Sequence, residues 1–246
     1  MAVWRWPRLL WRTVHALWWA VWGVWVITQR FPKLNPEQRA AQVQLWSQRM
    51  LRAFGVRVQS QGQVWGGPVL RVANHLSWLD ILVMNAVAPS RFVSKAEVRQ
   101  WPLIGTLTVG AGTLLIEREK RRDAMRVVHH MAESLQAGDA VAVFPEGTTS
   151  NGEALLPFHA NLLQAAVVTD APVQPWALRY RHARTGQPHH APLFVGDTTL
   201  AASLLSTLLA SDLVAEVRLG EPQHCDGRDR RSWAEDLHRA VNGLRG

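Results

Sequence analysis

Two polar residues that follow an apolar stretch carry the chemistry available to this sequence. His75 and Asp80 come just after residues 68–73, whose composition is typical of a buried strand. On one continuous helix, two side chains five positions apart point roughly 140° apart and cannot meet. They can meet if His75 lies in the loop that ends the strand and Asp80 lies in the first turn of the following helix. A carboxylate that holds one imidazole nitrogen leaves the other available as a general base near neutral pH.

The same pair also fits a buried structural histidine beside a helix-capping aspartate, and a second stretch favours the catalytic interpretation. Residues 141–144 form another apolar run, which ends in the turn Pro145-Glu146-Gly147-Thr148-Thr149-Ser150. The backbone N–H groups and hydroxyls of such a turn suit an oxyanion or a phosphate. The sequence therefore offers a base and an anion-binding turn, each at the end of an apolar strand.

These two stretches, about seventy residues apart, resemble blocks of the glycerolipid acyltransferase family, the 1-acylglycerol-3-phosphate acyltransferases and their relatives. The family has an NHxxxxD block, a GxxFxxR-like block, an FPEGTR block and a proline-containing apolar strand. The corresponding segments here are residues 74–80, 112–118, 144–149 and 171–176. Two blocks in the family's order are a much stronger signal than either block alone.

The resemblance implies a role for individual residues. His75 would deprotonate an acceptor hydroxyl, and Asp80 would orient His75. Arg118 takes the family's headgroup-binding position, where a guanidinium can hold phosphate through two hydrogen bonds. Lys95 lies in a Lys-x-Glu segment like that of the family, which makes it a second phosphate contact. Glu146 is assigned to acceptor binding or to ordering of its loop.

The turn that follows supplies the remaining substrate-binding residues, Gly147, Thr148 and Thr149, which the resemblance assigns to the acceptor or oxyanion pocket. The family pattern most often has arginine at the position of Thr149, so this chain lacks one phosphate-binding cation there. Either Arg118 and Lys95 suffice for 1-acylglycerol-3-phosphate, or the acceptor is another lyso-lipid such as lyso-ornithine lipid. We expect 1-acylglycerol-3-phosphate as the acceptor, with phosphatidic acid as the product.

The implied reaction moves a fatty acyl group from an acyl thioester, carried by acyl carrier protein or CoA, to the free hydroxyl of a lysophospholipid. It requires no cofactor and no metal. A lipid hydrolase is one alternative, with Ser77 as the nucleophile, but the chain has no G-x-S-x-G elbow and Ser77 better fits a helix cap. A non-catalytic lipid-binding module is the other, and the intact His75, Asp80 and Glu146 argue against it.

Composition restricts the class of partner. The chain has 246 residues, a net charge of +8 and one cysteine, Cys225, so it can form one full domain and no intrachain disulfide. A basic surface attracts anionic lipid, nucleic acid or an acidic carrier protein. Nucleic-acid binding is disfavoured because the aromatic residues gather at the N-terminus instead of interleaving with a basic stripe. Metal binding is disfavoured because no cysteine partner or H-E-x-x-H motif accompanies the paired histidines.

The first thirty residues predict contact with a membrane. They hold seven of the thirteen tryptophans, a residue that favours the membrane–water interface. The uninterrupted apolar run, residues 16–27, is shorter than the roughly twenty residues that a spanning helix needs. We therefore expect a monotopic interfacial helix on the cytoplasmic face of a bacterial inner membrane, with a single spanning helix as the alternative. Basic residues on both sides of the run would add attraction to anionic lipid.

A second helix is predicted at residues 36–54, with Asn35 as its N-cap, Pro36 at its first position and Gly55 beyond its end. The two helices form a predicted hairpin, and the second helix either lies in the membrane interface or packs on the globular part. From Val56 onward, short strands alternate with helices, which is typical of an α/β fold.

The predicted organisation is a membrane-associating segment, residues 1–54, and a single catalytic domain, residues 55–246, with a central mixed sheet flanked by helices. The predicted strands are 56–59, 68–73, 91–93, 113–116, 140–144, 173–180 and 214–219. The predicted helices of this domain are 78–87, 122–137, 161–169, 199–210 and 231–244.

Overall fold

The computed structural model describes residues 5–116 and 121–246, and its centre is a sheet of seven strands in the order β1-β7-β6-β2-β5-β3-β4. All neighbouring strands are parallel except β6 and β7, which are antiparallel, so the predicted mixed sheet is confirmed. The strands are β1 (Val56–Gln61), β2 (Val69–Ala73), β3 (Arg91–Lys95), β4 (Leu114–Ile116), β5 (Ala140–Val143), β6 (Val173–His182) and β7 (Leu213–Leu219).

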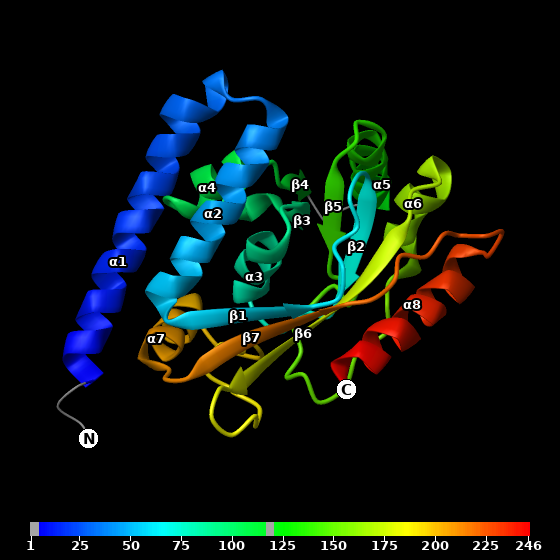
Figure 1. Ribbon diagram of the computed structural model, residues 1–246. Helices are drawn as coiled ribbons and strands as arrows, with labels where there is room; N and C mark the ends of the chain where they lie inside the picture. Colours follow the sequence, from blue (N-terminus) through cyan, green and yellow to red (C-terminus); the bar gives the residue numbers. More distant parts are fainter. Residues whose placement is uncertain (1–4, 117–120) are drawn as a thin grey trace.

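Helices cover both faces of this sheet (Figure 1). The α-helices are α1 (Arg5–Trp25), α2 (Pro36–Phe54), α3 (Leu79–Val87), α4 (Ile104–Gly110), α5 (Arg121–Gln136), α6 (Gln164–Thr169), α7 (Leu200–Leu209) and α8 (Arg230–Arg245). Short turns of other helix types are η1 (Val26–Arg30), η2 (Phe31–Lys33), η3 (Ala96–Gln100) and η4 (Ala160–Leu163). One apolar core lies between the sheet and α2, α3 and α7, and the other lies between the sheet and α5, α6 and α8.

Strand β2 lies at the centre of the sheet, between β6 and β5, and all five of its residues are buried. Strands covered by helices on both faces carry a continuous apolar run, which explains the composition of this segment. Val72 pairs with Val143 of β5, and Ala73 pairs with Trp176 of β6. The carboxyl ends of β2 and β5 are therefore neighbours, and ligands of open α/β sheets bind beyond this end.

Helices α1 and α2 form an antiparallel hairpin along one side of the molecule (Figure 1). Asn35 caps α2 with a complete capping box, because its Oδ1 accepts from the Gln38 N–H at 2.8 Å and its own N–H donates to Gln38 Oε1 at 3.1 Å. The helix ends at Gly55, whose φ of 76° favours glycine. Helix α2 packs between α1 and α3, so the second predicted helix lies against the globular part.

Helix α1 presents an apolar stripe to the outside, at helical spacing. The exposed members are Trp6, Leu10, Trp11, Val14, Leu17, Trp18, Val21 and Trp25. Its inner face is held by the Trp46 indole N–H of α2, which donates to the Trp19 carbonyl at 2.7 Å. Within residues 5–116 and 121–246, no helix combines the length and the apolarity needed to cross a membrane.

The structure departs from the predicted elements in two places. Residues 96–110 form η3 and α4, which the sequence did not predict. These elements pack tightly, since a side chain at Gly105 would lie 2.1 Å from the Arg99 carbonyl oxygen. The predicted helix 161–169 is divided into η4 and α6. The sequence pattern of such short elements is too brief to separate them from loops.

Candidate functional site

His75 and Asp80 lie in contact at the carboxyl end of β2. The imidazole Nδ1 is 2.9 Å from Asp80 Oδ2, because β2 ends before His75 and Asp80 lies in the first turn of α3. The same Oδ2 accepts the backbone N–H groups of Leu76 at 2.7 Å and Ser77 at 2.8 Å. Asp80 is completely buried, so these N–H groups offset the loss of water around its charge. Ser77 Oγ accepts from the Leu79 N–H at 3.2 Å, a local side-chain contact just before α3, whose N-cap residue is Trp78.

The other carboxylate oxygen of Asp80 has a partner from a distant part of the chain. The Tyr180 hydroxyl of β6 donates to Asp80 Oδ1 at 2.6 Å, and Tyr180 is 3% exposed. Burial, together with the neighbouring Asp80 charge and this hydrogen bond, raises the pKa of Tyr180 well above its usual range. The phenol therefore keeps its proton and remains a donor at neutral pH.

The imidazole of His75 is also fixed by its ring and backbone. The ring stacks on Phe144 at a centroid distance of 3.9 Å with 6° between the ring planes. The His75 N–H donates to Glu146 Oε1 at 2.7 Å, and the His75 carbonyl accepts the Ser150 N–H at 2.8 Å. The His75 side chain is 20% exposed and lines the main cavity of the protein, which leaves Nε2 as the nitrogen available to a substrate.

Glu146 joins two loops through backbone N–H groups. One carboxylate oxygen accepts from His75, and the other accepts from the Leu156 N–H at 2.9 Å. Burial raises the pKa of Glu146, and the hydrogen bonds from Leu156 and His75 oppose this rise. Of the two roles expected for Glu146, these contacts correspond to ordering of the loops.

The turn of residues 147–149 lines the same cavity as His75. Gly147 has a φ of 71°, and a side chain there would lie 3.0 Å from the His159 ring. The Gly147 N–H donates to the Phe144 carbonyl at 3.0 Å, and the Thr149 hydroxyl donates to the Phe194 carbonyl. For the N–H groups of Thr148 and Thr149, the described residues supply no hydrogen-bond acceptor, and both threonines line the cavity.

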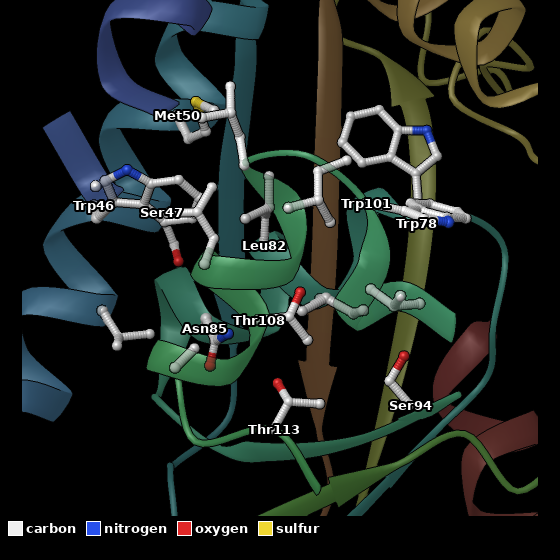
Figure 2. A pocket seen from close by; sticks show the side chains of 18 of the residues that line it. Trp46, Ser47, Met50, Trp78, Leu82, Asn85, Ser94, Trp101, Thr108 and Thr113 are labelled. Carbon is white, nitrogen blue, oxygen red and sulfur yellow. The ribbon is translucent and has the colours of Figure 1, made fainter. Parts of the chain in front are cut away.

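A cavity of about 1320 Å³ extends from His75 between helices α1, α2, α3 and α4. Most of the residues that line it are apolar. Figure 2 labels the apolar residues Trp46, Met50, Trp78, Leu82 and Trp101 and the polar residues Ser47, Asn85, Ser94, Thr108 and Thr113. An apolar cavity with few polar groups suits a hydrocarbon chain better than a polar metabolite.

Of the two predicted phosphate contacts, the structure describes the backbone position of one, Lys95. Lys95 is the last residue of β3 and pairs with Ile116, the last residue of β4. Arg118 follows Ile116 by two positions and lies outside the described residues. The backbone therefore brings Lys95 beside the segment that leads to Arg118.

Two residues near the site escaped the sequence-based prediction. Tyr180 belongs to no motif of charged or nucleophilic residues and lies a hundred positions from Asp80. His159 lines the cavity next to Gly147, beyond the last block residue of that turn. The only signal for Tyr180 was its place in an apolar strand. Tyrosine is common in strands, so this signal does not mark a functional residue.

Groups of three side chains that could hold a metal ion are absent from the part of the chain that the structure describes. His129 and His130 both pair with Glu133 on the exposed face of α5, at 3.2 and 3.0 Å.

These features define a class of protein: an α/β enzyme whose imidazole–carboxylate pair, at the end of the central parallel strand, faces an apolar cavity. The chain belongs to the acyltransferase family, because the family model described as Acyltransferase matches residues 48–179.

Named relatives agree with this membership. A lyso-ornithine lipid O-acyltransferase of Pseudomonas aeruginosa is 40% identical over 196 residues, which are 80% of this chain and 75% of the relative. A Brucella abortus protein of the same name is 36% identical over 206 residues, 78% of this chain and 77% of the relative. A 1-acyl-sn-glycerol-3-phosphate acyltransferase of Neisseria gonorrhoeae is 46% identical over 126 residues, about half of each chain (50% and 49%).

The fold has a counterpart among solved structures. The 1-acyl-sn-glycerophosphate (LPA) acyltransferase PlsC of Thermotoga maritima superposes with a TM-score of 0.62 at 20% identity, over 96% of this chain and 98% of the other. The predicted fold class, an α/β domain preceded by N-terminal helices, is therefore confirmed.

Proposed function

We propose that this acyltransferase moves a fatty acyl group from a thioester of acyl carrier protein or CoA to the free hydroxyl of a lyso-lipid, with His75 as the general base. The observation that carries the proposal is the geometry of His75. Its Nδ1 is 2.9 Å from the buried Asp80 carboxylate, and its side chain lines the apolar cavity. One imidazole nitrogen is thus held, and the other is available to a lipid hydroxyl.

The reaction follows from these groups. The acceptor hydroxyl gives its proton to His75 Nε2 while its oxygen attacks the thioester carbonyl carbon. The negative charge that develops on the carbonyl oxygen is met by the N–H groups of Thr148 and Thr149. The intermediate then collapses, the carbon–sulfur bond breaks, and the His75 imidazolium returns the proton to the departing thiolate. The Asp80 carboxylate stabilises the imidazolium.

Lyso-ornithine lipid is the acceptor that we propose first. The Pseudomonas and Brucella relatives of that name match over three-quarters or more of both chains, whereas the match to the Neisseria relative covers about half. Thr149 supports the same choice, because its hydroxyl replaces the family's frequent arginine and is already bonded to the Phe194 carbonyl. The sequence alone favoured 1-acylglycerol-3-phosphate, and this acceptor is the second candidate because the Neisseria relative of that activity is 46% identical over 126 residues.

Headgroup contacts are proposed for Lys95 and Arg118. The support is the resemblance to the family's blocks, together with the pairing of Lys95 with Ile116, the residue two positions before Arg118 in the sequence. A carboxylate or a phosphate on the acceptor would be attracted to this end by the same charges.

The proposed location is the cytoplasmic face of a bacterial inner membrane, with α1 in the interface. The support is the exposed apolar stripe, in which Leu10 is 67% and Trp18 is 61% exposed. Tryptophan and leucine on one helix face are typical of an interfacial helix. The acceptor and the product are both lipids, so the site would meet them where they reside.

The experiment is acyl transfer by purified protein with both donors, lyso-ornithine lipid and 1-acylglycerol-3-phosphate, for wild type and His75→Ala. We expect product with wild type and a loss of roughly 10²–10⁴-fold in kcat/KM in the variant, the usual contribution of a positioned general base. His130→Ala, an exposed histidine on α5, is the matched control and should retain full activity.

Three outcomes would contradict parts of the proposal. Full activity of folded His75→Ala would remove its role as base. Release of free fatty acid without an acceptor would identify a hydrolase. No product from folded protein in lipid, with any donor, would favour a lipid-binding module.

A further inference from the structure

The hydrogen bond between Tyr180 and Asp80 lies at the site but takes no direct part in the proposed acyl transfer. Asp80 Oδ2 receives His75 and two backbone N–H groups, whereas Oδ1 receives the Tyr180 hydroxyl. Among the described residues, no other donor to Oδ1 is found. Both side chains are buried, so water does not replace the phenol if it is removed.

The pairing of β6 with β2 determines where the Tyr180 hydroxyl lies. Asn74, just before the base, continues the pairing of β2 with β6 through its side chain: its Nδ2 donates to the Leu178 carbonyl at 3.0 Å, and its Oδ1 accepts the Leu178 N–H at 2.7 Å. Leu178 and Tyr180 are two positions apart on β6 and therefore share one face of the sheet. This is the face on which α3 packs, and α3 carries Asp80.

We propose that Tyr180 is a positioning residue, which orients the Asp80 carboxylate and sets the basicity of His75 through it. By donating to Oδ1, the phenol keeps the carboxylate in the rotamer that points Oδ2 at His75 Nδ1. It also takes up part of the carboxylate charge, so Asp80 attracts the imidazolium less strongly than an unpartnered carboxylate would. Tyr180 transfers no proton in this role. The inference rests on the proposed function of His75 as the base.

Other charged groups near His75 stay unchanged in the test below. The described ones are Asp80 on α3, Glu146 in the loop after β5, His159 before η4, Arg49 on α2 and Glu97 on η3. Of these groups only Asp80 contacts the Tyr180 hydroxyl, so a change at Tyr180 acts on His75 through Asp80.

Tyr180→Phe removes one oxygen and keeps the ring. Without the phenol, the Asp80 carboxylate holds the imidazolium more strongly, so His75 stays protonated to higher pH. We expect the acid limb of the pH profile of kcat/KM to move upward by about one pH unit, and kcat/KM near neutral pH to fall by up to roughly tenfold. The KM for the acceptor should change little, because the buried Tyr180 lies behind Asp80.

Tyr180 is the only tyrosine of the chain, which allows the opposite change. Biosynthetic replacement of tyrosine by 3-fluorotyrosine alters this one position and makes the phenol a stronger hydrogen-bond donor. The acid limb should then move downward, so phenylalanine, tyrosine and fluorotyrosine form an ordered series. If Tyr180 had only a structural role, the replacements would lower the melting temperature without shifting the acid limb in this order.

Thr207→Val is the matched control, because it also deletes a completely buried hydroxyl, one that donates to the Ser203 carbonyl within α7 at 2.8 Å. It should lower the melting temperature and leave the acid limb in place. The inference is overturned if folded Tyr180→Phe and the fluorotyrosine protein both keep the wild-type limb.

An NMR titration separates this inference from the proposed function. The His75 imidazole resonance, assigned by its absence in His75→Gln, should titrate at higher pH in Tyr180→Phe even if no lyso-lipid is acylated. Failure of acyl transfer in wild type would count against the function alone. An unmoved His75 titration would count against the role of Tyr180 alone.

Discussion

At the scale of single residues, the site depends on polar groups that are satisfied from more than one direction. Glu146 is the clearest case after Asp80, because its two carboxylate oxygens hold His75 and Leu156 by their backbone N–H groups. A buried carboxylate costs free energy when it ionises, and here burial is the largest effect on its pKa. Glu146 therefore links the stability of the loop to pH.

Glu146→Gln tests this link. The raised pKa of Glu146 means that the folded state resists ionisation, so the stability contributed by the protonated carboxyl is complete below its unfolded pKa, near 4.5. It is lost as pH rises through the folded pKa. The free energy of unfolding of wild type minus that of the variant should therefore decrease from pH 4 upward.

Urea unfolding at a series of pH values measures this difference. The glutamine oxygen can accept one of the two backbone N–H groups, but the glutamine NH₂ group then faces the other. The free energy of unfolding of the variant should therefore be about 1–3 kcal/mol lower than that of wild type at the pH where the difference is largest. Glu153→Gln, at an exposed position of the same loop, is the control. If the free energy of unfolding of wild type minus that of the variant grew with pH, the two N–H groups would have a larger effect on the Glu146 carboxyl than burial has.

Sequence alone located the residues of the site that belong to blocks, and it missed those that act across the fold. His75 and Asp80 are five positions apart, so local geometry was enough to predict that they could meet. Tyr180 reaches Asp80 through the register of β6 against β2, which the Asn74 side chain extends by bonding to Leu178. Register between strands a hundred residues apart is set by tertiary packing, which spacing in the chain does not encode.

At the scale of elements, one guanidinium of helix α1 contacts the end of α7. Arg12 donates to the carbonyls of Leu208 and Ala210 at the end of α7, at 2.8 and 2.6 Å. It also lies directly over Gly55, where any side chain would clash with it. Burial, followed by the charge of Arg8, lowers the pKa of Arg12. A cation at the end of α7 is favourable, because helix carbonyls carry partial negative charge there.

Arg12→Gln should loosen α1. The loss of charged hydrogen bonds to two carbonyls of this half-buried group should cost about 1–2 kcal/mol of stability. The expected results are a lower melting temperature and faster limited proteolysis of the segment that joins α1 to α2. Arg8→Gln, four positions earlier and exposed, is the control. Equal protease sensitivity of the two variants would assign the attachment of α1 to its apolar contacts.

All seven strands were predicted, with ends within two residues of those observed, because β-branched runs and turn residues mark them clearly. Helix α2 was predicted with its exact ends for the same kind of reason: Asn35, Pro36 and Gly55 are strong local signals. Helix α4 was missed because it is only seven residues long. It also follows Leu103, whose φ of 62° is not predicted by the sequence pattern.

At the scale of the whole molecule, α1 has two apolar faces with different partners. Its inner face walls the cavity with Ala16 and Ala20, and its outer face carries the stripe of tryptophans and aliphatic residues. The outer face is the surface that we propose for the membrane. Leu10 and Trp18 belong to the outer face and do not line the cavity, so they can be changed without altering it.

The double variant Leu10→Glu and Trp18→Glu should bind anionic vesicles at least tenfold more weakly in a flotation assay. Each site loses about 1.5–3 kcal/mol of apolar burial and gains repulsion from anionic lipid. Met125→Glu with Val168→Glu is the charge-matched control, because both residues are exposed on α5 and α6, across the sheet from α1. Unchanged vesicle binding of the first variant would place the membrane surface elsewhere.

The strand order also has a consequence for how the protein is made. The first strand, β1, pairs only with β7, which the ribosome delivers about 160 residues later. At ordinary translation speeds, β1 waits roughly 10–30 s with its hydrogen-bonding edge open. Tyr180, which supports Asp80, is likewise synthesised long after His75. A nascent chain can therefore contain every residue of the NHxxxxD block and still lack the Tyr180 contact to Asp80, and a stop codon before β7 would leave β1 without the strand it pairs with.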